Sequence, residues 1–156
     1  MITGAWRGLG RNAAARLHER GASVAVNVRE EDRANEVASA LGPRALAVPG
    51  DITDPRVPTE IVSRTLDRFG RIDILVNNAA HARPTRFEQL DAEEWRLGLE
   101  TNMTAPFLLM KAALPAMKAR SLPALLVKAR RCPGATLGQD GEGGLCESAA
   151  MSAVSV

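Results

Sequence analysis

The sequence predicts an α/β protein whose parallel sheet is covered by helices on both faces, and two periodicities lead to this prediction. The first is a set of short apolar runs of strand length, at 24–28, 45–48 and 72–76. The second is a set of stretches with apolar residues at helical spacing, at 11–20, 31–41 and 55–69. Strands alternating with helices predict a parallel sheet, and right-handed crossovers make it doubly wound.

The C-terminal third of the sequence changes character at about residue 120. Residues 92–120 form a long helical stretch, and its second half, 107–114, is apolar on most faces. Such a face packs against the sheet or joins a second helix in a homo-oligomer. Residues 125–127 predict one more strand, whereas the glycine-rich segment 134–144 has no clear period. We therefore divide the chain into a folded unit, 1–120, and a degenerate or truncated tail, 121–156.

Composition and charge exclude several classes of function. Charged residues make up 24% of the chain and its net charge is +2, with both signs interleaved, so a nucleic-acid-binding face is not expected. No apolar run approaches the ~20 residues that span a membrane, which makes a cytoplasmic protein the expectation. The two cysteines, Cys132 and Cys146, lack the paired spacing of a zinc site, and no metal is predicted.

The segment Thr3-Gly4-Ala5-Trp6-Arg7-Gly8-Leu9-Gly10 carries the main functional prediction. Its glycines permit a tight turn and let backbone N–H groups approach a pyrophosphate closely. A helix beginning near Leu9 would then place its positive end at the phosphates. Because this turn opens a chain with strand–helix–strand periodicity, unit 1–120 is predicted to bind a dinucleotide.

The turn resembles the cofactor loop of classical short-chain dehydrogenases/reductases, and three later segments resemble that family in order and spacing. These segments are Gly50-Asp51-Ile52-Thr53, Asn77-Asn78-Ala79-Ala80 and Thr101-Asn102-Met103-Thr104. The resemblance implies a Rossmann-like fold, truncated at both ends. It also implies hydride transfer between a nicotinamide and a carbonyl/alcohol pair, and the turn is similar to that of 3-oxoacyl reductases.

The resemblance assigns roles to individual residues. Asp51 would hydrogen-bond the adenine amino group, although a charge near a helix N-terminus is an alternative role, and Asn102 would be the catalytic asparagine. The remaining cofactor contacts would come from the turn and from the segments after the strands, namely Gly4, Arg7, Gly8, Leu9, Gly10, Arg29, Ile52, Asn78 and Ala79.

The end of the second predicted strand favours NADP over NAD. An acidic residue there accepts hydrogen bonds from the adenosine 2′-hydroxyl in NAD-preferring proteins. This chain has Val28 at that position, followed by Arg29, and Arg7 lies inside the glycine turn. Two guanidinium groups beside a phosphate of about two negative charges predict a preference for NADP.

The chemistry of the family depends on a tyrosine and, four residues later, a lysine, and neither can be placed here. The chain contains no tyrosine, and no lysine follows Lys128. When the chain is aligned with the family, the family's Tyr-x-x-x-Lys helix corresponds to residues 147–154, with Glu147 in place of the tyrosine and Met151 in place of the lysine. Arg130-Arg131 then stand where the family carries two serines, one of which steadies the substrate oxygen. Losing general acid catalysis costs about 10² to 10⁴ in rate, so little or no turnover is expected.

Two alternative functions remain open. One is a non-catalytic NADP-binding pseudoenzyme, and the other is a truncated or frameshifted remnant that acts at most through its 92–120 helix. Only Met1 and Ile2 precede Thr3, whereas a strand has about five residues, so a start site upstream and a frameshifted tail are a further hypothesis. His81 follows the Asn-Asn-Ala-Ala segment and is expected to be a polar loop residue.

Overall fold

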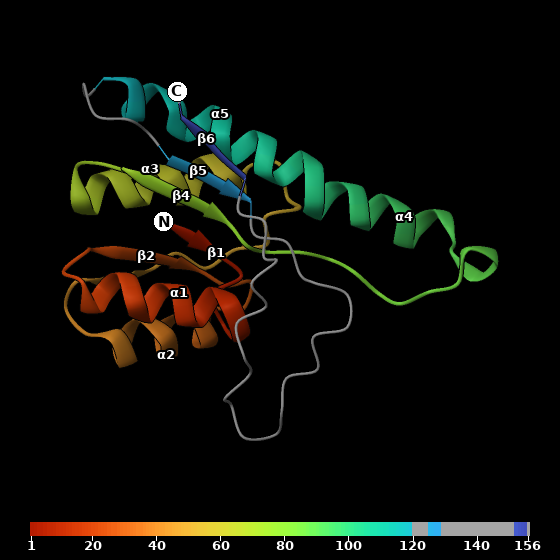
Figure 1. The fold of residues 1–156 in the computed structure, drawn as a ribbon, viewed down its shortest axis with the longest axis horizontal. Helices are drawn as coiled ribbons and strands as arrows, with labels where there is room; N and C mark the ends of the chain where they lie inside the picture. The colour runs from red at the N-terminus through yellow and green to blue at the C-terminus, as the bar shows by residue number, and fades with distance from the viewer. Residues whose placement is uncertain (120–124, 129–151, 156) are drawn as a thin grey trace.

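The structure, a computed structural model, describes residues 1–119 and two later strands, β5 (Leu125–Lys128) and β6 (Ser152–Ser155). The earlier strands are β1 (Ile2–Thr3), β2 (Val24–Asn27), β3 (Ala45–Ala47) and β4 (Ile74–Asn77). They form one sheet in the order β3-β2-β1-β4-β5-β6, in which β1 to β5 are parallel and β6 is antiparallel to β5. The predicted doubly wound α/β fold is confirmed (Figure 1).

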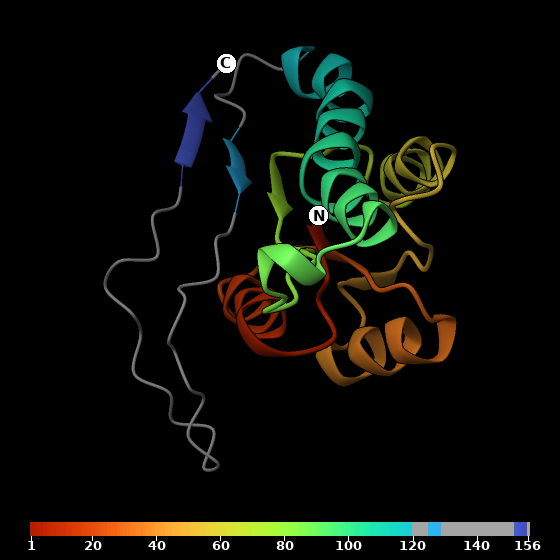
Figure 2. The ribbon, with the colours of Figure 1, turned by 90° about the vertical axis from the view of Figure 1, so that its right-hand side faces the viewer.

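Helices cover both faces of this sheet. Helices α1 (Gly8–Glu19) and α2 (Glu31–Leu41) lie on one face, and α3 (Val57–Phe69) and α5 (Ala105–Lys118) lie on the other (Figure 2). The helical stretch predicted at 92–120 consists of three consecutive elements: α4 (Ala92–Leu99), the π-helical segment Glu100–Thr104 and α5. A short 3₁₀ helix, Phe87–Gln89, precedes them. Within the described residues, no helix combines the length and apolar character needed to span a lipid bilayer.

Two apolar layers form the core, and the strands contribute to both by alternation. Val24 and Val26 pack toward α1 and α2, whereas Ala25 between them packs toward α3 and α5. Helix α5 supplies Leu109 and Ala113, which are fully buried. The apolar face predicted for this helix therefore packs on the sheet.

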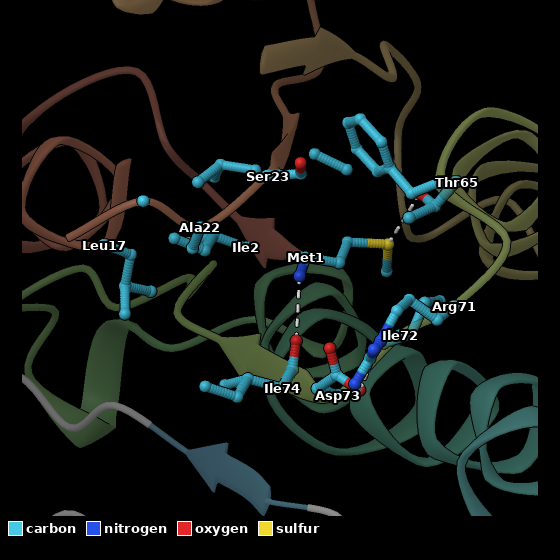
Figure 3. Close-up of a pocket in the computed structure, with 14 residues that line it drawn as sticks. Met1, Ile2, Leu17, Ala22, Ser23, Thr65, Arg71, Ile72, Asp73 and Ile74 are labelled. Atoms are coloured by element: carbon cyan, nitrogen blue, oxygen red, sulfur yellow. Dashed lines mark hydrogen bonds and ion pairs between the residues drawn. The ribbon is translucent and has the colours of Figure 1, made fainter. Parts of the chain in front are cut away.

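The amino end of β1 borders a cavity of about 390 Å³ between the starts of β2 and β4 (Figure 3). The amino group of Met1 lies there and donates a hydrogen bond to the carbonyl of Ile74 at 2.8 Å. Burial lowers the pKa of this amino group to about 5, and the negative charge of Asp73 acts in the opposite direction. The short first strand noted in the sequence is thus central in the sheet, with strands paired on both sides.

Two predictions for the tail have different outcomes. The strand predicted at 125–127 is confirmed as β5, which pairs in parallel with β4. The helix predicted over 147–154 is wrong at its C-terminal end, because Ser152–Ser155 pair with β5 as an antiparallel strand. Backbone pairing with an exposed sheet edge satisfies these N–H and C=O groups without a helix. Cys132, Cys146, Arg130-Arg131, Glu147 and Met151 lie outside the described residues.

Candidate nucleotide site

The glycine turn lies at the point where the strand order reverses. From β1 the chain proceeds outward through β2 and β3, and then returns to pair β4 on the other side of β1. In open parallel sheets, ligands bind at the carboxyl ends of the strands at such a switch point. The turn follows directly after β1 and is joined to the end of β2 by the bond from Ala5 N–H to the carbonyl of Asn27, at 3.1 Å.

The three glycines of the turn have different structural roles. Gly8 has a positive φ of 58° and no neighbour within 4 Å of the position of a Cβ, so the backbone there faces open space. A Cβ on Gly4 would lie 2.8 Å from Cα of Ala79, and one on Gly10 would lie 2.6 Å from the carbonyl oxygen of Gly4. Gly4 and Gly10 therefore allow close packing of the backbone, whereas Gly8 leaves room for a ligand.

Helix α1 begins directly at this open position. Its N-cap residue, Arg7, is extended, with φ −149° and ψ 171°, and its side chain does not cap the helix. The first N–H groups of a helix have no partner within the helix, and they carry partial positive charge. An anion of phosphate size fits this arrangement of donors and open space.

Asn78 holds the turn against the end of β4. Its side-chain Nδ2 donates to the carbonyl oxygens of Thr3 at 3.0 Å and Gly4 at 2.9 Å. In return, the backbone N–H groups of Asn78 and Ala79 donate to Oγ1 of Thr3, at 3.2 and 3.1 Å. Asn78 and Ala79 were predicted to contact the cofactor, and the structure shows that they fix the turn.

Asn27, at the end of β2, was not singled out as a site residue. It is 2% exposed, and its Nδ2 donates to the carbonyls of Val48 at 2.9 Å and Gly50 at 3.0 Å. These bonds fix the loop that carries Asp51 and Ile52. The polar side chain of this residue within the apolar run 24–28 was the only indication in the sequence, and it does not specify these partners.

Asp51 lies in a loop and not at a helix terminus. Its Oδ1 accepts hydrogen bonds from the backbone N–H of Thr53 at 3.0 Å and from the Thr53 hydroxyl at 2.8 Å. Helix α3 begins only at Val57, so the alternative role for Asp51 as a charge at its N-terminus does not fit. Ile52 beside it is buried.

The arginines predicted to receive a 2′-phosphate are at the surface, next to the turn. Val28 is buried, whereas the side chain of Arg29 is 70% exposed and pairs with Glu30 at 3.0 Å. Arg7 and Leu9 are exposed on the turn itself. The two arginines come from adjacent strand ends, because β1 and β2 are neighbours in the sheet.

Asn102 lies in the π-helical segment and binds the backbone of His81 through both atoms of its amide. Oδ1 accepts from the N–H of His81 at 3.0 Å, and Nδ2 donates to its carbonyl at 2.7 Å. Pro106, four residues later, has no N–H to donate to the carbonyl of Asn102. The side chain of Asn102 thus positions the segment after β4. The backbone carbonyl of Asn102 lacks the hydrogen bond that an α-helix would give it, because residue 106 is a proline.

His81 lies in the loop after β4, as expected, and its imidazole pairs with a carboxylate. Its Nε2 lies 2.6 Å from Oε1 of Glu94, with only 24% and 16% of the two side chains exposed. Glu94 is itself fixed in the first turn of α4, where its N–H donates to the N-cap Asp91 at 2.7 Å. A cavity of about 320 Å³ opens beside His81, Glu94 and Asn102.

Comparison with known proteins decides the family. A family model described as short chain dehydrogenase matches residues 1–124. The chain belongs to the short-chain dehydrogenase family. Among curated relatives, the 3-oxoacyl-[acyl-carrier-protein] reductase FabG of Escherichia coli is 33% identical over 153 residues, 98% of this chain and 61% of the relative. The trans-4-hydroxycyclohexanecarboxylate dehydrogenase of Sinomonas cyclohexanicum is 38% identical over 128 residues, 76% of this chain and 49% of the relative.

Solved structures of short-chain dehydrogenases have the same fold. The 3-ketoacyl-(acyl-carrier-protein) reductase of Brucella melitensis, complexed with NADH, has a TM-score of 0.77 at 31% identity, covering 81% of this chain and 54% of that structure. The alcohol dehydrogenase of Thermococcus sibiricus, complexed with 5-hydroxy-NADP, has a TM-score of 0.72 at 31% identity, covering 76% and 52%. The chain spans about half to three-fifths of the length of the relatives it matches.

Proposed function

We propose that this short-chain dehydrogenase polypeptide binds NADPH in preference to NADH and has little oxidoreductase turnover as a chain of 156 residues. The observation that carries the binding is the uncapped start of α1, which faces open space at Gly8. Its donors match a pyrophosphate, and Asn78 holds the turn in that shape before a ligand arrives. A pre-organised turn has less conformational entropy to lose on binding.

The proposed cofactor contacts follow from the geometry. Gly4, Gly8, Leu9 and Gly10 would surround the pyrophosphate, Asp51 and Ile52 the adenine, and Ala79 the ribose. Arg7 and Arg29 would pair with the 2′-phosphate, where buried Val28 offers no acceptor to a 2′-hydroxyl. When bound, the nicotinamide supplies or accepts a hydride.

The proposed low turnover follows from residues that the chain lacks. The family reaction needs a proton donor beside the carbonyl oxygen, and no tyrosine is present. Asn102 alone would remain from the catalytic set, and its amide is engaged with the backbone of His81. The substrate class, a small carbonyl/alcohol pair of the 3-oxoacyl type, is supported by the names of the reductases among its relatives.

Titration with both nucleotides tests this proposal. The change in NADPH fluorescence, followed as chain is added, should report binding that is tighter than for NADH. Absorbance at the nicotinamide band should stay constant when a 3-oxoacyl thioester is added. Binding of neither nucleotide would contradict the proposed site, and oxidation of NADPH would contradict the proposed low turnover.

An exposed apolar stripe that runs along α4, the π-helical segment and α5 favours a second property, association of two copies. Trp95, Leu99, Met103 and Phe107 recur at helical spacing and are 57%, 40%, 66% and 56% exposed. Exposed apolar side chains at this spacing are typical of helix–helix contacts.

We propose a homo-oligomer through this stripe. Light scattering should show a mass above 16.6 kDa that falls to the monomer in Phe107→Glu. A monomer at every concentration would refute it.

A further inference from the structure

Three charged side chains at the start of α2 form one ion-pair cluster. Arg29 donates to Oε1 of Glu30 through Nε at 3.3 Å and Nη2 at 3.0 Å. On the other carboxylate oxygen, Nη1 of Arg33 lies 3.8 Å from Oε2 of Glu30. The Glu30 side chain thus lies between two guanidinium groups, which are 70% and 49% exposed and accessible to an anion from solution.

Trp6 connects this cluster to the glycine turn. The guanidinium carbon of Arg33 lies 5.0 Å from the centre of the indole ring, and that of Arg11 lies 5.9 Å away. Contacts of this kind hold a cation over an aromatic face. Because Trp6 immediately precedes Arg7, the cluster lies beside the residue proposed to receive the adenosine 2′-phosphate.

We propose that Glu30 is a specificity-determining residue, whose carboxylate competes with the 2′-phosphate for Arg29 and Arg33 and so reduces the preference for NADPH over NADH. Carboxylate and phosphate both take charge-assisted hydrogen bonds from guanidinium groups. A phosphate of about two negative charges must either displace the Glu30 carboxylate from the guanidinium group of Arg29 or share that guanidinium group with it. The 2′-hydroxyl of NADH carries no charge and meets no such competition.

The ionisation of Glu30 keeps this competition present at neutral pH. A hydrogen bond from its own backbone N–H and those from Arg29 hold the pKa of Glu30 below its usual value. The inference rests on the proposed function, because the nucleotide must lie in the glycine turn.

The decisive variant is Glu30→Gln, which keeps the size of the side chain and removes its charge. Affinities of the unmodified chain and the variant are measured for NADPH, NADH, adenosine 2′,5′-bisphosphate and AMP. We expect NADPH and the bisphosphate to bind about fivefold more tightly to the variant, as expected for removing one charge a few ångströms from a phosphate, with NADH and AMP unchanged. Salt should shrink the gain, since both charges are exposed.

Glu31→Gln is the matched control, because it removes the same charge one residue later in the first turn of α2. It should change NADPH affinity by less than about twofold. In a third variant, Arg33→Gln, NADPH should bind a few-fold more weakly while NADH is unchanged. Folding of each variant is checked by its thermal unfolding.

The outcomes separate the inference from the function on which it rests. If the unmodified chain binds NADPH but Glu30→Gln binds it equally or more weakly, Glu30 does not compete with the phosphate, and the inference alone is overturned. An equal gain for NADPH and NADH overturns it too, since specificity is then unaffected. Binding of neither nucleotide by the unmodified chain overturns the proposed function and the inference with it.

Discussion

The two ends of strand β1 differ in how the protein satisfies its polar groups. At the carboxyl end, Thr3 and Gly4 are bound by the side chain and backbone of Asn78, and of the three glycines in the turn Gly8 alone faces open space. At the amino end, a cavity of about 390 Å³ borders the strand, and an ionisable group, the amine of Met1, is buried. The end proposed to bind nucleotide is closely hydrogen-bonded, and the opposite end is hollow.

This contrast teaches that the two ends should respond to different perturbations. The stability of a closely packed hydrogen-bond network falls when a side chain adds volume to it or when a donor is removed. A buried ionisable group is sensitive to pH, because burial disfavours its charged form. These perturbations should differ in the free energy of unfolding that they cost.

The largest effect is expected at the amino end, from pH. In a polypeptide that begins at Met1, the amine has a pKa of about 5 when folded and about 8 when unfolded. Between these values the unfolded state binds the extra proton, so stability falls as pH is lowered from 8 to 5, by up to about 4 kcal/mol. Urea unfolding at both pH values measures this difference.

Acetylation of the amine provides the control for this pH effect. The acetylated chain should lose the pH dependence of stability that comes from the amine. Asp54, whose pKa is lowered to about 2 by Arg56, titrates below the range from pH 5 to 8 in both forms and so adds nothing to the difference. An identical pH dependence in both forms would mean that the amine is not buried as the structure has it.

The second effect tests the close packing at the carboxyl end. Gly10→Ala would place a Cβ 2.6 Å from the carbonyl oxygen of Gly4, so backbone must move. We expect a loss of about 2–3 kcal/mol and of nucleotide binding. Gly98→Ala in α4 meets nothing within 4 Å and should instead gain about 0.5–1 kcal/mol. Equal effects of the two substitutions in urea unfolding would refute the crowding at Gly10.

The smallest effect compares two asparagines that end the strands on either side of β1. Asn27→Leu would leave the carbonyls of Val48 and Gly50 without their donor and should cost about 1–2 kcal/mol. Asn77, also buried, has an Oδ1 with no hydrogen-bond partner among the described residues. Asn77→Leu should therefore cost less, as measured by thermal unfolding. A greater loss for Asn77→Leu would show that the Asn27 bonds contribute little.

The sequence predicted the helices and strands well where periodicity was strong. The predicted helix 31–41 matches α2, and the strands differ from the predicted runs by a few residues at their ends. The π-helical segment Glu100–Thr104 was not predicted, because its apolar spacing is close to that of an α-helix. The helix expected over 147–154 failed at 152–155, where the available edge of β5 decided the outcome.

For the site, the glycine spacing and the family motifs located the turn, Asp51, Asn78 and Asn102. They did not reveal that both hydrogen-bonding atoms of the Asn102 amide bind His81, or that Asn78 donates to two carbonyls of the turn. Residues 21 to 75 positions apart in the chain meet here, and spacing along the sequence carries no information on such pairs.

The sequence by itself determined the α/β alternation, the glycine turn and the lack of a tyrosine, because these depend on local periodicity and composition. Only the tertiary structure decided which groups from distant positions in the chain meet: Arg33 lies over Trp6, and Met1 lies beside Ile74. The physical reason is that the order of strands in the sheet sets these distances, and that order results from packing of the whole chain.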